Sequence, residues 1–158
     1  MRIPRPEDQA PERFDRSRHT LRLRAFLPST KEALNSAVRD VLKLARQCGC
    51  VRDTQADLEI ALREALANAI IHGNDLEDGK RIFLRCYGAP GSDLLILVRD
   101  EGPGFDPASV PDPRDGDRKH LNHGRGLLLM RELMDYVEYR RSGCEVLIYK
   151  SCGPRPKE

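Results

Sequence analysis

"ALREALANAIIHGN", residues 61–74, combines a helical apolar pattern with an unexpected polar residue. Asn68 lies in a run of Ala and Leu, where its short amide competes for backbone hydrogen bonds and lowers helix propensity. Glu64 comes four residues earlier and His72 four residues later. Because residues four apart are neighbours on a helix surface, we expect a carboxylate, an amide and an imidazole to form one row beside the apolar stripe.

Such a row has the chemistry of a catalytic or metal site. An amide oxygen on a rigid helix can ligate Mg²⁺, which prefers oxygen ligands and retains several waters. A carboxylate one turn away can accept a proton or orient a water. The alternative is a solvent-facing polar row in which Asn68 is merely tolerated, and this segment alone does not decide between the two.

A second candidate site is "VRDEGPGFD", residues 98–106, where Asp100 ends an apolar strand pattern. Gly102 and Gly104 allow a sharp turn and the close approach of a ligand. A carboxylate fixed at this position can accept a hydrogen bond from an exocyclic amine. The alternative is an ordinary Asp-Gly turn.

A third candidate site is "HGRGLLLMRELM", residues 123–134, in which two glycines precede an apolar helical pattern. The amides at a helix N-terminus favour phosphate, and Arg125 can add a cationic contact. The alternative is a helix that begins after a flexible loop. Neither the dinucleotide pattern G-x-G-x-x-G nor a P-loop occurs in the chain, so nucleotide binding would need another scheme.

Together and in this order, the three motifs resemble the GHKL ATPase superfamily, whose Bergerat fold is an α/β sandwich. "EALANAIIHG" is similar to its N box, "DEGPGFD" to its first glycine box and "GRGLLLM" to its second. Within the superfamily, "NAIIHGN", "DEGPGFDP" and "GRGLLLMRELMDYVEY" most resemble the bacterial anti-sigma-factor serine/threonine kinases. The resemblance covers roughly residues 20–150.

The resemblance implies a role for each motif. It places Mg²⁺ at Asn68, the adenine amine of ATP at Asp100, and the general base that activates a protein hydroxyl at Glu64. His72 is expected to brace the helix end beside the nucleotide. The remaining nucleotide-binding positions would come from the two glycine boxes: Gly102, Gly104, Phe105, Gly124, Arg125, Gly126 and Leu127.

The resemblance also implies partners, namely a sigma factor that the chain sequesters and a small antagonist protein that it phosphorylates. Such a protein is usually a homodimer. A nucleotide-binding module that sequesters a partner without phosphotransfer is the main alternative, and other GHKL chemistry is a further one. A histidine kinase fragment is disfavoured, since no long dimerising helix with a phosphoacceptor His is evident.

Periodicity predicts an α+β two-layer sandwich, with a mixed, mostly antiparallel sheet and helices on one face. Ser29 or Thr30 is expected to cap the first helix and Gly49 to end it, while Thr54 is expected to cap the second. Strands are expected at 20–28, 81–88, 93–100 and in a hairpin that turns at Ser142–Gly143. Helices are expected at about 31–48, 54–72 and 126–136, with a lid over about 106–123.

Composition suits one domain with terminal tails. The chain has 158 residues and a formal charge of +2, which gives no reason to expect nucleic acid as a bulk electrostatic partner. Apolar runs are too short to span a membrane, and five scattered cysteines are expected to be thiols in a reducing cytoplasm. We expect mobile tails at 1–18 and 152–158 and an ATP-binding kinase domain over 19–151.

Overall fold

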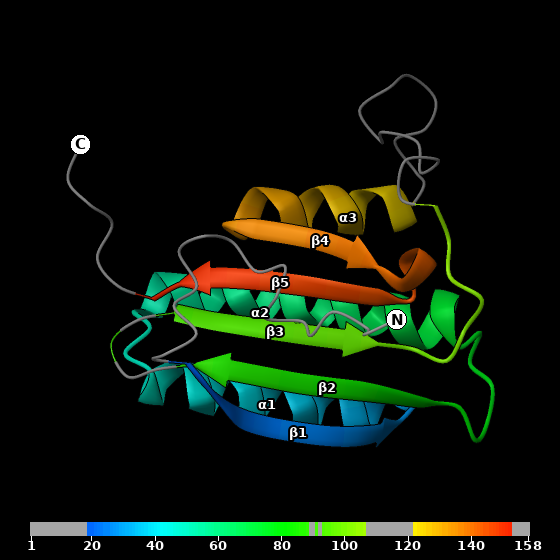
Figure 1. Cartoon of the computed structure of the whole chain (residues 1–158), viewed down its shortest axis with the longest axis horizontal. Helices are drawn as coiled ribbons and strands as arrows, with labels where there is room; N and C mark the ends of the chain where they lie inside the picture. Colours follow the sequence, from blue (N-terminus) through cyan, green and yellow to red (C-terminus); the bar gives the residue numbers. More distant parts are fainter. Residues whose placement is uncertain (1–18, 89–90, 92, 107–121, 153–158) are drawn as a thin grey trace, which may run out of the picture.

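The computed structural model describes residues 19–88, 91, 93–106 and 122–152. The element order is strand, two helices, hairpin, helix and hairpin, as predicted (Figure 1). The strands are β1 (Thr20–Pro28), β2 (Arg81–Gly88), β3 (Asp93–Arg99), β4 (Tyr136–Arg140) and β5 (Glu145–Ser151). The helices are α1 (Lys31–Gln47), α2 (Arg52–Asn68) and α3 (Asn122–Leu133). The expected tails at 1–18 and 153–158 and most of the expected lid, at 107–121, lie outside the described residues, whereas Cys152 of the expected C-terminal tail is described.

The five strands form one sheet in the order β1-β2-β3-β5-β4. Every neighbouring pair in the described part is antiparallel, in agreement with the mostly antiparallel sheet that was expected. Helices α1 and α2 lie behind the sheet in Figure 1, and α2 packs against both α1 and α3. The α+β two-layer sandwich is therefore confirmed.

Alternation along the strands supplies one side of the core. Ile82, Leu84 and Cys86 of β2 face the helices together with Leu94, Ile96 and Val98 of β3. They pack against apolar residues of the helices that include Val41, Leu58 and Leu62, all of them fully buried. Because side chains alternate between the two faces of a strand, the remaining residues of β2 and β3 point to the outer face of the sheet.

The helix starts confirm one sequence prediction and correct another. Thr30 caps α1 by accepting a hydrogen bond from the Ala33 N–H at 3.2 Å, as expected. Thr54 does not cap α2, because the helix already begins at Arg52, where Val51 provides no side-chain cap. The Gln55 side chain instead donates to the Cys50 carbonyl at 2.7 Å and holds the turn before the helix.

Two of the five cysteines are paired, which corrects the expectation that all are thiols. Cys50 and Cys152 form a disulfide across 102 residues of sequence, with their Cα atoms 4.3 Å apart. Cys50 follows α1 and Cys152 follows β5, so only the tertiary fold brings them together. Cys48, Cys86 and Cys144 are free. Within the described residues, no helix is both long and apolar enough to cross a membrane.

Candidate nucleotide site

The predicted polar row lies where α2 ends and its geometry changes. Glu64 and Asn68 belong to the last turns of α2, whereas His72 lies in the following π-helical turn, η2 (Ala69–Gly73). The Asn74 N–H donates to the Ala69 carbonyl at 2.8 Å and closes this wider turn. Single π-helical turns are frequent at functional sites because they redirect side chains at a helix end.

A pocket of about 160 Å³ opens beside this turn. Five of the predicted site residues line it: Asn68, His72, Asp100, Gly104 and Phe105. The pocket is smaller than the ~300 Å³ at the lower end of drug-sized ligand sites, and it suits a planar base rather than a whole nucleotide. The sequence-predicted N box and first glycine box therefore meet at one cavity.

Glu64 and the second glycine box meet next to this pocket. A Cβ atom built on Gly126 would lie 2.6 Å from Glu64 Oε2 and 3.5 Å from Asn68 Nδ2. Both side chains therefore reach toward the same point above α3, and a larger residue at position 126 would require the end of the Glu64 side chain to move. The end of α2 and the second glycine box, far apart in the sequence, meet in this way, although Glu64 and Gly126 do not line the pocket itself.

The second glycine box lies inside a helix rather than before one. Because α3 begins at Asn122, its backbone is expected to use the N–H groups of Gly126 and Leu127 for intrahelical hydrogen bonds. Only the first N–H groups of a helix stay available to an anion, so of the four predicted positions Gly124 is the one suited to bind phosphate. The Leu127 side chain is buried in the core, and Arg125 is exposed.

The Asn68 amide has an unmet hydrogen-bonding capacity. Its Nδ2 atom is buried and has no hydrogen-bond partner among the described residues. It lies near the phenol of Tyr139, whose pKa is raised to about 12 by burial, a rise that the Asn68 side chain opposes. Because this interaction with the Tyr139 phenol does not have normal hydrogen-bond geometry, an acceptor on a bound ligand would satisfy the buried Nδ2 group better.

Asp100 presents a half-buried carboxyl group to the pocket. Its Oδ1 atom accepts a hydrogen bond from the Gly102 N–H at 2.8 Å, and its own N–H donates to the Cys144 carbonyl at 2.9 Å. Burial raises the pKa of Asp100, while the Gly102 N–H and the charge of Lys80 act in the opposite direction. One side of the carboxylate is thus fixed by the protein, and the other can accept a hydrogen bond from an amine.

The glycines around Asp100 allow protein segments to approach one another. A Cβ on Gly73 would overlap the Asp100 carboxyl group, and a Cβ on Gly102 would overlap the Gly73 carbonyl, at contact distances of 2.2 and 1.9 Å. Gly104 has a φ of +81°, and a Cβ there would lie 2.0 Å from the Ser142 carbonyl oxygen. Close packing of backbone, rather than ligand approach alone, requires these glycines.

Gly104→Ala should therefore lower the free energy of unfolding by at least about 3 kcal/mol, since it adds a steric overlap to an unfavourable φ. Gly79→Ala is the matched control, because Gly79 has a φ of +86° and nothing within 4 Å of its Cβ position. It should cost only about 1–2 kcal/mol. Urea denaturation measures both variants, and equal losses would show that the overlap with Ser142 is unimportant.

Several residues of the site were not foreseen from the sequence. Gly73, Tyr139, Gly143 and Cys144 line the pocket, together with apolar side chains of α2, β3 and β5. Asn74 is fully buried and joins three segments. Its side chain donates to Ser29 Oγ and the Arg81 carbonyl and accepts from the Glu101 N–H, at 2.8–3.0 Å. By holding Glu101, Asn74 fixes the neighbouring Asp100.

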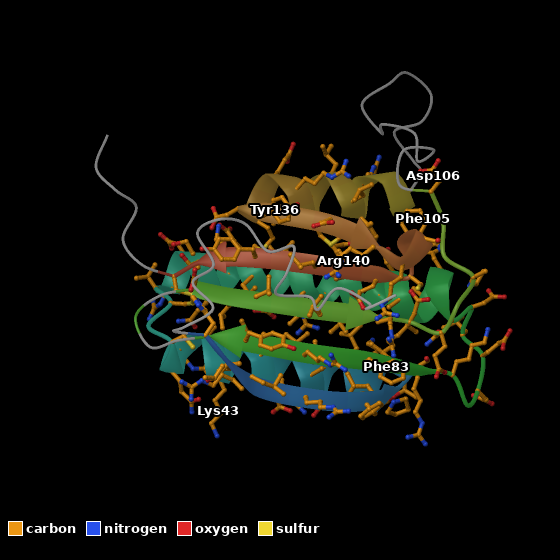
Figure 2. The ribbon with its side chains drawn as sticks, in the orientation of Figure 1. Lys43, Phe83, Phe105, Asp106, Tyr136 and Arg140 are labelled. Atoms are coloured by element: carbon orange, nitrogen blue, oxygen red, sulfur yellow. A yellow bond between two sulfur atoms is a disulfide. The ribbon has the colours of Figure 1, made fainter. Side chains whose placement is uncertain are left out.

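Signals for these residues are weak in a single sequence. Gly73 and Asn74 end the first motif, where the sequence pattern indicates no role for them. Tyr139 lies in a hairpin strand whose alternation only indicates that it faces inward. In Figure 2, Phe105 lies beside β4, and its ring contacts the Tyr139 ring edge-on with centroids 5.0 Å apart.

Residues 27–150 match the family described as the histidine kinase-like ATPase domain. The chain belongs to this family. The match spans α1, α2, the whole pocket and α3, so the expected GHKL membership is confirmed. Membership of an ATPase family implies that this histidine kinase-like ATPase domain uses ATP.

Curated relatives indicate the branch of the family. The chain is 28% identical over 119 residues to the serine-protein kinase RsbW of Oceanobacillus iheyensis, covering 71% of this chain and 74% of that protein. It is also 28% identical over 131 residues to RsbW of Bacillus velezensis, covering 78% and 81%. The anti-sigma F factor of Oceanobacillus iheyensis is 28% identical over 88 residues, covering 54% and 60%. These similarities support the expected relation to anti-sigma kinases.

Proposed function

We propose that this histidine kinase-like ATPase domain is an anti-sigma serine/threonine protein kinase. It would hold a sigma factor and transfer the γ-phosphoryl group of ATP to a hydroxyl of a small antagonist protein. The observation that carries the proposal is that Asn68 and Asp100 line one pocket, while Glu64 and Asn68 both reach toward Gly126 of α3 beside it. Relatives named serine-protein kinase and anti-sigma factor support it. Residues 19–151 would form the working unit, as a homodimer.

The residues present fit Mg²⁺-ATP. Asp100 offers an acceptor for the adenine amine, the unpaired Asn68 Nδ2 group offers a donor to a phosphate oxygen, and the Asn68 carbonyl oxygen would be the atom that ligates Mg²⁺. Bound Mg²⁺-ATP would supply the phosphoryl group and neutralise its charge, which phosphoryl transfer requires above all. His72 lines the same pocket and would support the end of α2 there.

Glu64 would act on the incoming protein hydroxyl. A serine hydroxyl is a weak nucleophile at neutral pH and needs a base to take its proton during attack. The Glu64 carboxylate reaches the point above Gly126 that the Asn68 amide also reaches, so it can hold this proton close to the phosphates. The phosphorylated antagonist protein would then dissociate. Glu64 would release the proton to solvent and return to its ionised form.

The test is transfer of labelled γ-phosphate to a protein that co-purifies with the chain from its native cell. We expect a sigma factor and a small serine-bearing protein among the partners, and label on the second only. ATP binding without transfer to any co-purified protein would instead support a module that sequesters its partner without chemistry. Absence of ATP binding would contradict both.

A further inference from the structure

A cluster of arginines and aromatic rings occupies one end of the outer sheet face, opposite the helices. Arg24 and Phe26 of β1, Phe83 and Arg85 of β2, and Arg99 of β3 form this cluster. Phe83 is labelled on β2 in Figure 2, on the face of the sheet turned away from α1 and α2. We call these five residues the outer arginine cluster.

Strand register sets like charges against each other in this cluster. Arg24 of β1 is directly opposite Arg85 of β2, and Phe26 is opposite Phe83. Arg85 is opposite Leu97, so Arg99 is its diagonal neighbour on β3. Like charges directly opposite each other on a sheet destabilise it. No carboxylate pairs with Arg24, Arg85 or Arg99 within the described part of the chain.

Aromatic rings hold two of these guanidinium groups in place. Arg99 lies over the Phe83 ring at 4.3 Å from its centroid, and Arg24 lies over Phe26 at 5.5 Å. A guanidinium stacked on a ring keeps its N–H edge free to bind a carboxylate. The two rings also contact each other edge-on at 4.7 Å, and 48% of Phe26 is exposed.

A small cavity of about 50 Å³ lies within this surface. Phe83, Arg85, Leu97 and Arg99 line it, with Arg141 and Glu145 at its other side. Arg141 is paired with Glu145 at 3.1 Å, whereas Arg85 and Arg99 contribute two uncompensated positive charges. The cavity therefore combines the apolar side chains of Phe83 and Leu97 with three arginines and the Glu145 carboxylate.

We propose that the outer arginine cluster binds an acidic, extended segment of a partner protein. Alternate side chains of an extended peptide lie about 7 Å apart, which matches the ~7–8 Å between diagonal neighbours such as Arg85 and Arg99. Two carboxylates at this spacing would meet both guanidinium groups, with an apolar side chain over Phe26. Glu145 at the rim disfavours a run of phosphates, so a protein segment fits better than nucleic acid.

The proposal does not depend on the nucleotide chemistry, because the cluster and the nucleotide pocket lie on opposite faces of the sheet. It is tested at low salt with a fluorescent decapeptide that places Val, Glu and Glu at successive alternate positions, with Ser between them, so that all three face the cluster. The double variant Arg85→Gln with Arg99→Gln should weaken binding at least about tenfold. Arg39→Gln with Arg46→Gln removes the same charge from exposed positions of α1 and should change binding less than about twofold.

Fold integrity is measured on the same samples. Arg85→Gln alone should raise the melting temperature at low salt, since it relieves the repulsion from Arg24. The same variant should lower the affinity for the peptide. No binding by the parent, or equal losses in both double variants, would overturn the proposal. A labelled DNA duplex that binds the parent more tightly than the peptide, and loses more affinity in the Arg85 and Arg99 variant, would also overturn it.

Discussion

Glu64→Gln is expected to lower phosphotransfer to the antagonist at least about a hundredfold while Mg²⁺-ATP binding stays nearly intact. A general base typically contributes about 10²–10⁴-fold, and glutamine keeps the shape of glutamate but cannot take a proton. Glu64 does not line the nucleotide pocket, so the affinity for the nucleotide should change little. The measurement is the transfer rate of labelled γ-phosphate together with a calorimetric titration of each variant.

Glu59→Gln provides the matched control for this substitution. Glu59 lies on the same helix, about 140° around its axis from Glu64, and pairs with Arg63 at 3.1 Å with 42% of its side chain exposed. Its loss should leave the transfer rate within about twofold of the parent, because surface pairs contribute little. Equal transfer rates in Glu64→Gln and the parent would remove the general-base role, whatever the ATP affinity.

Asp100→Asn is expected to weaken ATP binding by about ten- to hundredfold. A hydrogen bond to a charged group contributes roughly 1.5–3 kcal/mol, and the amide offers a poorer acceptor that also carries a donor. The Gly102 N–H can still donate to the amide oxygen, so the turn should persist. Calorimetry with Asp53→Asn as an exposed control measures the effect, and unchanged affinity in Asp100→Asn would contradict the site.

The same variant should be at least as stable as the parent at pH 7. Burial raises the pKa of Asp100, so the folded state penalises the ionised form. The stability associated with the neutral carboxyl is present below the ordinary carboxyl pKa and is lost as the pH rises through the raised value. The advantage of Asp100→Asn should therefore shrink below about pH 4. Urea denaturation at both pH values tests this, and a less stable variant at pH 7 would count against it.

Local patterns were enough to predict the order of elements. Alternation located β1 at Thr20–Pro28 and β2 at Arg81–Gly88, and both strands have those bounds in the structure. Helix ends were less accurate. Thr54 has the chemistry of a cap, but the turn held by Gln55 starts α2 earlier. Glycines suggested a late start for α3, whereas the helix begins at Asn122 and includes Gly126.

The candidate site was predicted where polar residues interrupt an apolar pattern, as at Asn68 and Asp100. Site residues were missed where only tertiary packing brings them to the site. Asn74 joins three segments, and Tyr139 enters the pocket from a strand 71 residues after Asn68. The Cys50–Cys152 pair was missed for the same reason, because no spacing rule connects residues this far apart.

Asp100 is proposed to recognise ATP by accepting a hydrogen bond from the amine of its adenine. The most direct measurement is the ratio of ATP to GTP affinity in the parent and in Asp100→Asn. A carboxylate can accept from the amine of adenine, but it repels the carbonyl oxygen that guanine carries at the same position. We predict that the parent prefers ATP by at least about a hundredfold, since a site built around a hydrogen bond strongly rejects an analogue without it. The preference should fall at least about tenfold in Asp100→Asn, and a ratio near one in the parent, or the same ratio in both proteins, would contradict the claim.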